Sequence, residues 1–163
     1  MPLFETVYGG KGKLKDGREV AVPPRTVLQR MGPCLPVIIS ATQEHQDTLV
    51  QRGIEVPNPI SGTGLIDTGA SVTAVDEDVC RKMALTVTSA MQVSHPGGNE
   101  TRACYAIQIH FPGTPIPPLI APMAISVNLG GGQPPYILLI SRDLLAHLRM
   151  VYNGPMGRIE LAF

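Results

Sequence analysis

Tryptophan is absent from this 163-residue chain, and cysteine is scarce. The three cysteines, Cys34, Cys80 and Cys104, are odd in number and show no C-x-x-C spacing, so we expect neither a disulfide framework nor a cysteine-rich zinc site. The four histidines are scattered without a metal-binding spacing, and we therefore expect no metal ion and no other cofactor. Free thiols of this kind are typical of a reducing compartment.

An excess of charge of one sign is also lacking, because 13 basic residues balance 13 acidic ones. This balance argues against nucleic acid or an acidic membrane surface as a partner of the whole chain. No apolar run approaches the length of a membrane span, and the N-terminus lacks the basic and then apolar build of a signal peptide. We therefore expect a cytoplasmic protein with no membrane span.

Glycine and proline, by contrast, are abundant, with 17 and 16 residues that separate short apolar runs. This pattern predicts one mainly β domain with few helices. Near the N-terminus, residues 3–8 and 18–22 are expected to pair as a hairpin through the turn signal at 15–18, and a connector follows over 25–33.

Further strands are expected wherever apolar and β-branched residues gather. They lie at 34–40, 63–67, 85–93, 102–111, 123–129 and 136–140, before a final hairpin over 151–162. The strands at 85–93 and 102–111 form a long hairpin with a glycine-rich tip, SHPGGN, and Gly130–Gly132 is expected to be another turn. Two short helices are expected over 76–83 and 143–149, and residues 42–53 form either a loop or a short helix.

The segment GLIDTGAS, residues 64–71, carries the candidate chemistry. Asp67 comes directly after a short apolar strand and directly before Thr68 and Gly69. Backbone N–H groups can orient a carboxylate at such a strand end, and glycine lets the backbone approach closely. The plain structural alternative is an aspartate that merely caps a turn.

The pattern apolar-apolar-Asp-Thr-Gly-Ala-Ser resembles the catalytic loop of the retropepsin-like aspartic proteases, in particular cellular members of bacterial type. In that family a second apolar strand precedes Gly-Arg-Asp/Asn and a short helix, and ILLISRDLL at 137–145 is similar to it. A glycine-tipped hairpin lies between the two segments in the family, as SHPGGN does here. The resemblance covers roughly 36–163, so we expect a protease domain over 34–163 and an N-terminal hairpin extension of unknown role over 1–33.

The resemblance implies an all-β, closed and barrel-like acid-protease lobe that hydrolyses peptide bonds in a peptide or protein substrate. The reaction requires two carboxylates that share one proton around a water molecule. This chain has one D-T-G motif, so a homodimer with two-fold symmetry is expected to supply the second Asp67.

The resemblance also implies roles for individual residues. Asp67 is the catalytic acid and base, Thr68 braces the two catalytic loops across the dimer axis, and Gly69 permits their close approach. Residues implied in substrate binding are Ala70, Ser71, Gly97, Gly98 and Arg142, with the two glycines at the tip of a flap. Arg142 is expected to anchor the region through an ion pair, and Asp143 to cap the following helix.

Two other interpretations stay open. The first is a dimer of the same fold that binds peptides with weak or no activity, and the second is a non-proteolytic β domain with a chance D-T-G turn. Ser141 bears on the first, because the family usually has glycine at this position. A positive φ angle there would strain a serine.

Overall fold

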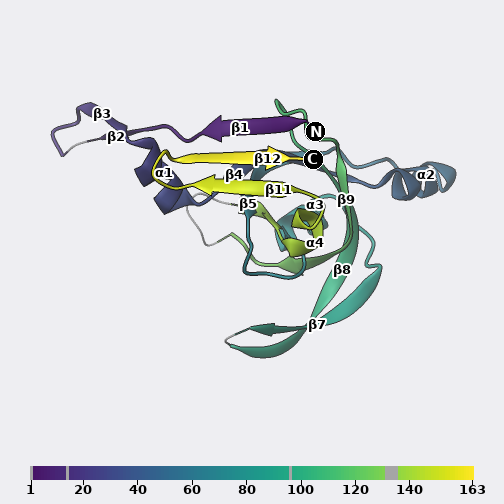
Figure 1. The fold of residues 1–163 in the computed structure, drawn as a ribbon. Coiled ribbons are helices and arrows are strands. Elements are labelled where there is room, and N and C mark those ends of the chain that lie inside the picture. Colours follow the sequence, from purple (N-terminus) through teal and green to yellow (C-terminus); the bar gives the residue numbers. More distant parts are fainter. Residues whose placement is uncertain (1, 14, 96, 131–135) are drawn as a thin grey trace.

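The computed structural model describes residues 2–13, 15–95, 97–130 and 136–163. Within these ranges the chain forms a seven-stranded sheet, a three-stranded sheet, a two-stranded hairpin and four helices (Figure 1). The prediction of a mainly β protein is confirmed. Over the same ranges, no helix has the length and apolar character needed to cross a membrane.

The seven-stranded sheet carries the long hairpin and the D-T-G segment. Its strands are β4 (Cys34–Ala41), β5 (Ile60–Ile66), β6 (Ala74–Asp76), β7 (Ser89–His95), β8 (Gly98–His110), β9 (Leu119–Val127) and β10 (Tyr136–Ile140). They lie in the order β4-β5-β10-β6-β9-β8-β7, and an additional pairing joins β4 to β8. β10 runs parallel to β5 and antiparallel to β6.

The sequence YILLI explains why β10 lies inside the sheet. Leu138 and Ile140 are fully buried, and they pack with β4 and β8 residues such as Ile39 and Ile107 in the main core. A strand with neighbours on both sides and apolar residues throughout satisfies its backbone polar groups within the sheet. The predicted central strand at 136–140 is therefore confirmed.

The N-terminal strand does not pair as the sequence suggested. β1 (Leu3–Val7) pairs antiparallel with β12 (Arg158–Ala162), which in turn pairs with β11 (Arg149–Asn153). Only β2 (Gly10–Lys13) and β3 (Glu19–Val22) form the expected hairpin, so the prediction for 3–8 was wrong. Figure 1 shows β1 and β12 side by side, with the two ends of the chain close together. The final hairpin over 151–162 is confirmed.

The expectation of two helices was also wrong, because four are present among the described residues. They are α1 (Pro24–Met31), α2 (Gln43–Gln51), α3 (Glu77–Lys82) and α4 (Arg142–Leu145). α1 replaces the connector expected at 25–33, since Val27 and Leu28 are buried against the core. α2 decides the open alternative at 42–53 in favour of a helix. α4 is shorter than expected because the chain enters β11 at Arg149.

The described residues before β4 contribute to the main core. Tyr8, Val27 and Leu28 belong to the same buried cluster as the central strands. The hydroxyl of Tyr8 donates to the carbonyl oxygen of Cys34 at 2.8 Å, which ties this segment to the start of β4. Of the turn expected at 130–132, Gly130 lies in a turn, whereas 131 and 132 lie outside the described residues.

Candidate active site

Asp67 lies at the carboxyl end of β5, beside the end of β10. Its backbone N–H donates to the carbonyl oxygen of Ile140 at 2.9 Å, which continues the parallel pairing of the two strands by one residue. Its carboxylate Oδ1 accepts a hydrogen bond of 2.8 Å from the backbone N–H of Gly69. The side chain is half-buried, so the carboxylate is oriented by the loop and still reaches solvent.

A hydrogen bond from Gly69 N–H to Asp67 is the geometry of an ordinary Asx turn, so it does not by itself distinguish a catalytic aspartate from a turn cap. What sets Asp67 apart is the groove onto which it opens. The groove has a volume of about 640 Å³, within the usual range for ligand sites. Its lining residues are Asp67, Gly69, Ala70, Ser71, Val72, Met91, Gln92, Val93, Ser94, Ile125 and Arg142.

The structure brings together most of the site residues inferred from the sequence. Four residues of the 67–71 segment line the groove together with Arg142, whereas Thr68 is exposed in the same loop and does not line it. Gly97 and Gly98 also do not line it, since they lie at the exposed tip of the β7–β8 hairpin. Gly98 has a φ angle of 123°, which explains the need for glycine at that position.

The opposite wall of the groove was not predicted from the sequence. Met91, Gln92, Val93 and Ser94 of β7 form this wall, and Ile125 of β9 lies beneath it. Met91 and Val93 pack on a second small core cluster around Ile125. The alternation of apolar and polar residues in β7 was the available signal, because it gives the strand one face toward the sheet.

Arg142 is held by hydrogen bonds and not by the expected ion pair. Its backbone N–H and its Nε both donate to the carbonyl oxygen of Ala70, at 3.2 and 3.1 Å. No ion pair joins it to a carboxylate in the described part of the chain. The side chain therefore fixes the loop that follows Asp67 while its charge remains in the groove.

Asp143 joins the two loops at the end of the sheet, and its Oδ1 also accepts from the backbone N–H of Leu144 at 2.9 Å, in the first turn of α4. Its Oδ1 accepts from the hydroxyl of Thr73 at 2.7 Å, and its Oδ2 accepts from the backbone N–H of Thr73 at 2.9 Å. The N-cap position of α4 is Ser141, which makes no side-chain capping hydrogen bond. Thr73 is fully buried and also accepts from the backbone N–H of Ser141 at 3.2 Å.

Ser141 does not carry the backbone strain that a positive φ angle would have caused. Its φ and ψ angles are −105° and −175°, an extended conformation that any residue adopts. Its side chain is fully buried, and its hydroxyl oxygen has no hydrogen-bond partner among the described residues. The serine is therefore compatible with the backbone of this loop.

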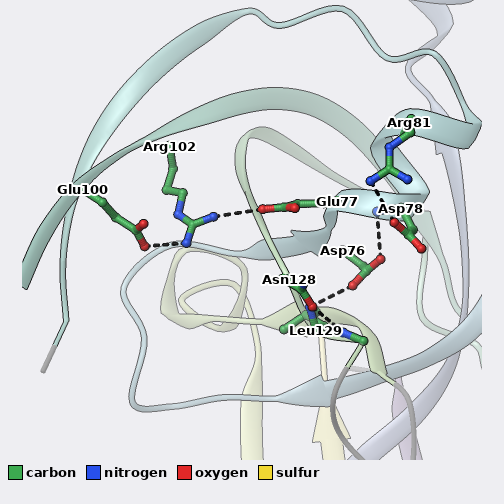
Figure 2. Close-up of polar contacts among 9 residues, drawn as sticks. Asp76, Glu77, Asp78, Arg81, Glu100, Arg102, Asn128 and Leu129 are labelled. Carbon is green, nitrogen blue, oxygen red and sulfur yellow. Dashed lines mark hydrogen bonds and ion pairs between the residues drawn. The ribbon is translucent and has the colours of Figure 1, made fainter. Parts of the chain in front are cut away.

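The hairpin that forms the groove wall is anchored near its base by charged residues (Figure 2). Arg102 of β8 pairs with Glu77 of α3 at 3.0 Å and with Glu100 at 2.6 Å. Beside this cluster, the buried carboxylate of Asp76 accepts from the backbone N–H groups of Asp78 at 2.9 Å and Leu129 at 2.8 Å. These contacts connect the hairpin to α3, and α3 to the segment after β9.

Cys34 and Cys80 do not offer a nucleophile. Burial raises the pKa of the Cys80 thiol to about 12, and the negative charge of Asp76 adds to the effect. Burial also raises the pKa of Cys34. A thiol with a raised pKa is protonated near neutral pH and reacts slowly. Within the described residues, no group of three or more His, Cys, Asp and Glu side chains could hold a metal ion.

No protein-family model matches the chain, and a search of curated proteins finds no match. The residues of the groove are therefore the basis for a functional proposal. They offer one oriented carboxylate, one arginine and a wall of mostly apolar side chains.

Proposed function

We propose that the protein is an aspartic endopeptidase that acts as a homodimer, with Asp67 from each of two identical chains in one active site. One observation carries the proposal. A half-buried carboxylate, oriented by the N–H of Gly69, opens onto a groove of about 640 Å³ that has a β-hairpin as its opposite wall. A groove of this size can hold several residues of an extended peptide.

The need for a second chain follows from the chemistry. Asp67 is the one carboxylate among the described residues that line the groove, and hydrolysis by this route requires two. A two-fold axis close to Asp67 would bring the two carboxylates together. We further propose that the additional β4–β8 pairing makes each chain a closed, barrel-like lobe, as in the acid proteases.

In the proposed mechanism the two Asp67 carboxyl groups share one proton. Two like charges about 3 Å apart do not both ionise readily, so the pKa values of the pair separate. The ionised carboxylate accepts a proton from the attacking water, while the protonated one donates to the carbonyl oxygen of the peptide. Asp143 and Thr73 support this geometry indirectly, since they fix the loop that carries Asp67.

The hairpin also suggests how a substrate is held. β7 is the last strand in the order of the large sheet, so one of its edges has backbone groups that no described strand pairs. An extended peptide can pair with such an edge and place alternate side chains into the groove. Met91, Val93 and Ile125 offer apolar surface there. Strain at Ser141 was the main reason to consider an inactive dimer, and the extended backbone of Ser141 gives no support to that reason.

The test is cleavage of an unstructured protein at mildly acidic pH. We expect Asp67→Asn to lower the cleavage rate at least about a hundredfold, because acid–base catalysis typically contributes that much. Asp47→Asn is the matched control, since Asp47 is exposed on α2, where its carboxylate accepts a hydrogen bond from the side chain of Gln43. A statine-type inhibitor should block the activity, and the pH profile should be bell-shaped. Full activity of Asp67→Asn, or an active monomer, would refute the proposal.

A further inference from the structure

Arg142 combines a fixed orientation with a free charge. Because Nε donates to the carbonyl oxygen of Ala70, the plane of the guanidinium group is set by the loop. The two terminal nitrogens form the opposite edge of that plane, and they can donate two parallel hydrogen bonds to one carboxylate. The orientation of these donors is therefore largely settled before a ligand arrives.

Two other arginines, Arg102 and Arg158, already form ion pairs with carboxylates within the fold. Arg102 pairs with Glu77 and Glu100, and Arg158 pairs with Glu5 and Glu160. Arg142 has no such partner among the described residues and is the one cation in the lining of the groove. The groove thus presents an unmatched positive charge beside Asp67 and apolar side chains.

We propose that Arg142 selects substrates that carry a carboxylate close to the scissile bond. The inference rests on the proposed peptidase function, because it names the substrate class of the same groove. Ala70 follows Asp67 by three residues, a span of at most about 11 Å in a fully extended chain. A bound peptide rises about 3.3 Å per residue, so this span corresponds to about three residues, and we place the carboxylate within about four residues of the scissile bond.

Two sources could supply this carboxylate, an Asp or Glu side chain or the C-terminus of the peptide. A set of quenched fluorescent peptides separates them. All peptides share one cleaved sequence, carry Glu or Gln at each of four positions on either side of the scissile bond, and end in an amide or a free carboxylate. We expect one acidic position, or the free C-terminus, to raise kcat/KM by about fivefold to tenfold.

Variants of Arg142 assign this preference to its charge. Arg142→Gln should abolish the preference, Arg142→Lys should retain part of it, and Arg142→Glu should favour Lys at the same peptide position. The backbone N–H of Arg142 still donates to Ala70 in each variant, so the loop keeps one of its two hydrogen bonds. Arg52→Gln is the matched control, because Arg52 is exposed at the end of α2 and does not line the groove. It should leave the preference unchanged.

A measurement on the unchanged protein is independent of any folding defect in the variants. The preference for the acidic peptide should weaken from 0.05 M to 1 M salt, because the Debye length falls to about 3 Å at 1 M. Equal rates for Glu and Gln at all positions and for both termini would overturn the inference. A preference that survives in Arg142→Gln would overturn it as well.

An intersubunit role for Arg142 is the rival explanation. In that case Arg142→Gln would weaken the dimer in analytical ultracentrifugation and slow cleavage of all peptides equally, which would overturn the inference while Asp67-dependent cleavage remained. If no peptide is cleaved, the proposed function fails, and the inference is then decided by binding. Fluorescence anisotropy should show about fivefold tighter binding of the acidic peptide, lost in Arg142→Gln. Equal or absent binding would overturn it.

Discussion

Replacing Thr73 with valine removes one hydroxyl group from the framework beneath Asp67. That hydroxyl donates to Asp143 at 2.7 Å and accepts from the backbone N–H of Ser141 at 3.2 Å. Thr73 and Ser141 are both fully buried, so water does not replace the lost partner of the Ser141 N–H without structural change. Valine has nearly the shape of threonine, and the change therefore isolates the polar contacts.

The expected cost in the free energy of unfolding is about 2.5–4 kcal/mol. A hydrogen bond to a charged group contributes about 1.5–3 kcal/mol, and a buried N–H left without a partner costs about 1–3 kcal/mol. We place the sum in the lower half of that range for two reasons. The bond from Ser141 is long, and the backbone N–H of Thr73 still donates to Asp143 at 2.9 Å.

Urea unfolding at a fixed protein concentration measures this cost, and the fixed concentration matters because a dimer gains stability by mass action. Thr73→Ser keeps the hydroxyl and loses a methyl group, so it should destabilise less than Thr73→Val. Thr48→Val on the partly exposed side of α2 should change stability by less than about 0.5 kcal/mol. A loss of less than about 0.5 kcal/mol for Thr73→Val, as expected for Thr48→Val, would refute the assigned role of the hydroxyl. A larger loss for Thr73→Ser than for Thr73→Val would refute it as well.

Two further predictions concern the fold and its response to pH. Gly157→Ala should lower the free energy of unfolding by at least about 3 kcal/mol, because its φ is +60° and a Cβ would overlap the carbonyl carbon of Pro24. Gly9→Ala is the control, because a Cβ at Gly9 would meet open space, and it should leave the stability nearly unchanged. Thermal unfolding of both variants measures the difference, and equal losses of stability would contradict the clash at Gly157. The raised pKa of Cys80, about 12, means that the folded thiol stays protonated while the unfolded one ionises above about 8.5. The free energy of unfolding should therefore fall from about pH 8.5 toward pH 12, and Cys80 should contribute at most about 1.4 kcal/mol per pH unit to this fall. Urea unfolding under reducing conditions should show a shallower fall for Cys80→Ala than for the unchanged protein. Equal slopes for the two proteins would refute the assignment.

The strands that could be predicted are those whose side chains report burial locally. The apolar run of β10 and the alternation along β8 are visible in the sequence, because a half-buried strand must place every second residue toward the core. The partner of β1 was not visible in this way. Its alternation fits β3 or β12 equally well, and the choice depends on Ile159 and Leu161, which lie about 155 residues further along the chain.

The helix α1 was missed for a related reason. Pro23 and Pro24 indicate a turn, and only Val27 and Leu28 form its buried side. Helices this short gain their stability from tertiary packing and not from intrinsic propensity. The local sequence of 25–33 therefore does not distinguish a helix from a connector until the surface that covers it is known.

In the candidate site, too, local features could be predicted from the sequence and long-range contacts could not. Asp67, Gly69 and Arg142 were found because they belong to short motifs in which neighbours in sequence are neighbours in space. The role of Asp143 was predicted only in part, because its contact with Leu144 at the start of α4 is local whereas its other partner, Thr73, lies 70 residues away. The apolar wall from β7 was missed because apolar residues in a strand usually indicate core packing, and here they serve both purposes.

The pairing of β1 with β12 has a consequence for synthesis of the protein. Val7 pairs with Arg158 and Leu3 with Ala162. The ribosome therefore adds about 150 residues after β1 before it begins to make β12, the partner of β1. At about 5–20 residues per second, that interval is roughly 8–30 s. During this time the residues of β1 have no partner strand, and their unpaired backbone groups are a template for wrong pairing with other nascent chains. Loss of residues 159–163 would remove most of β12 and leave β1 without its partner. A truncation at one end of the sequence would therefore promote aggregation through a strand at the other end.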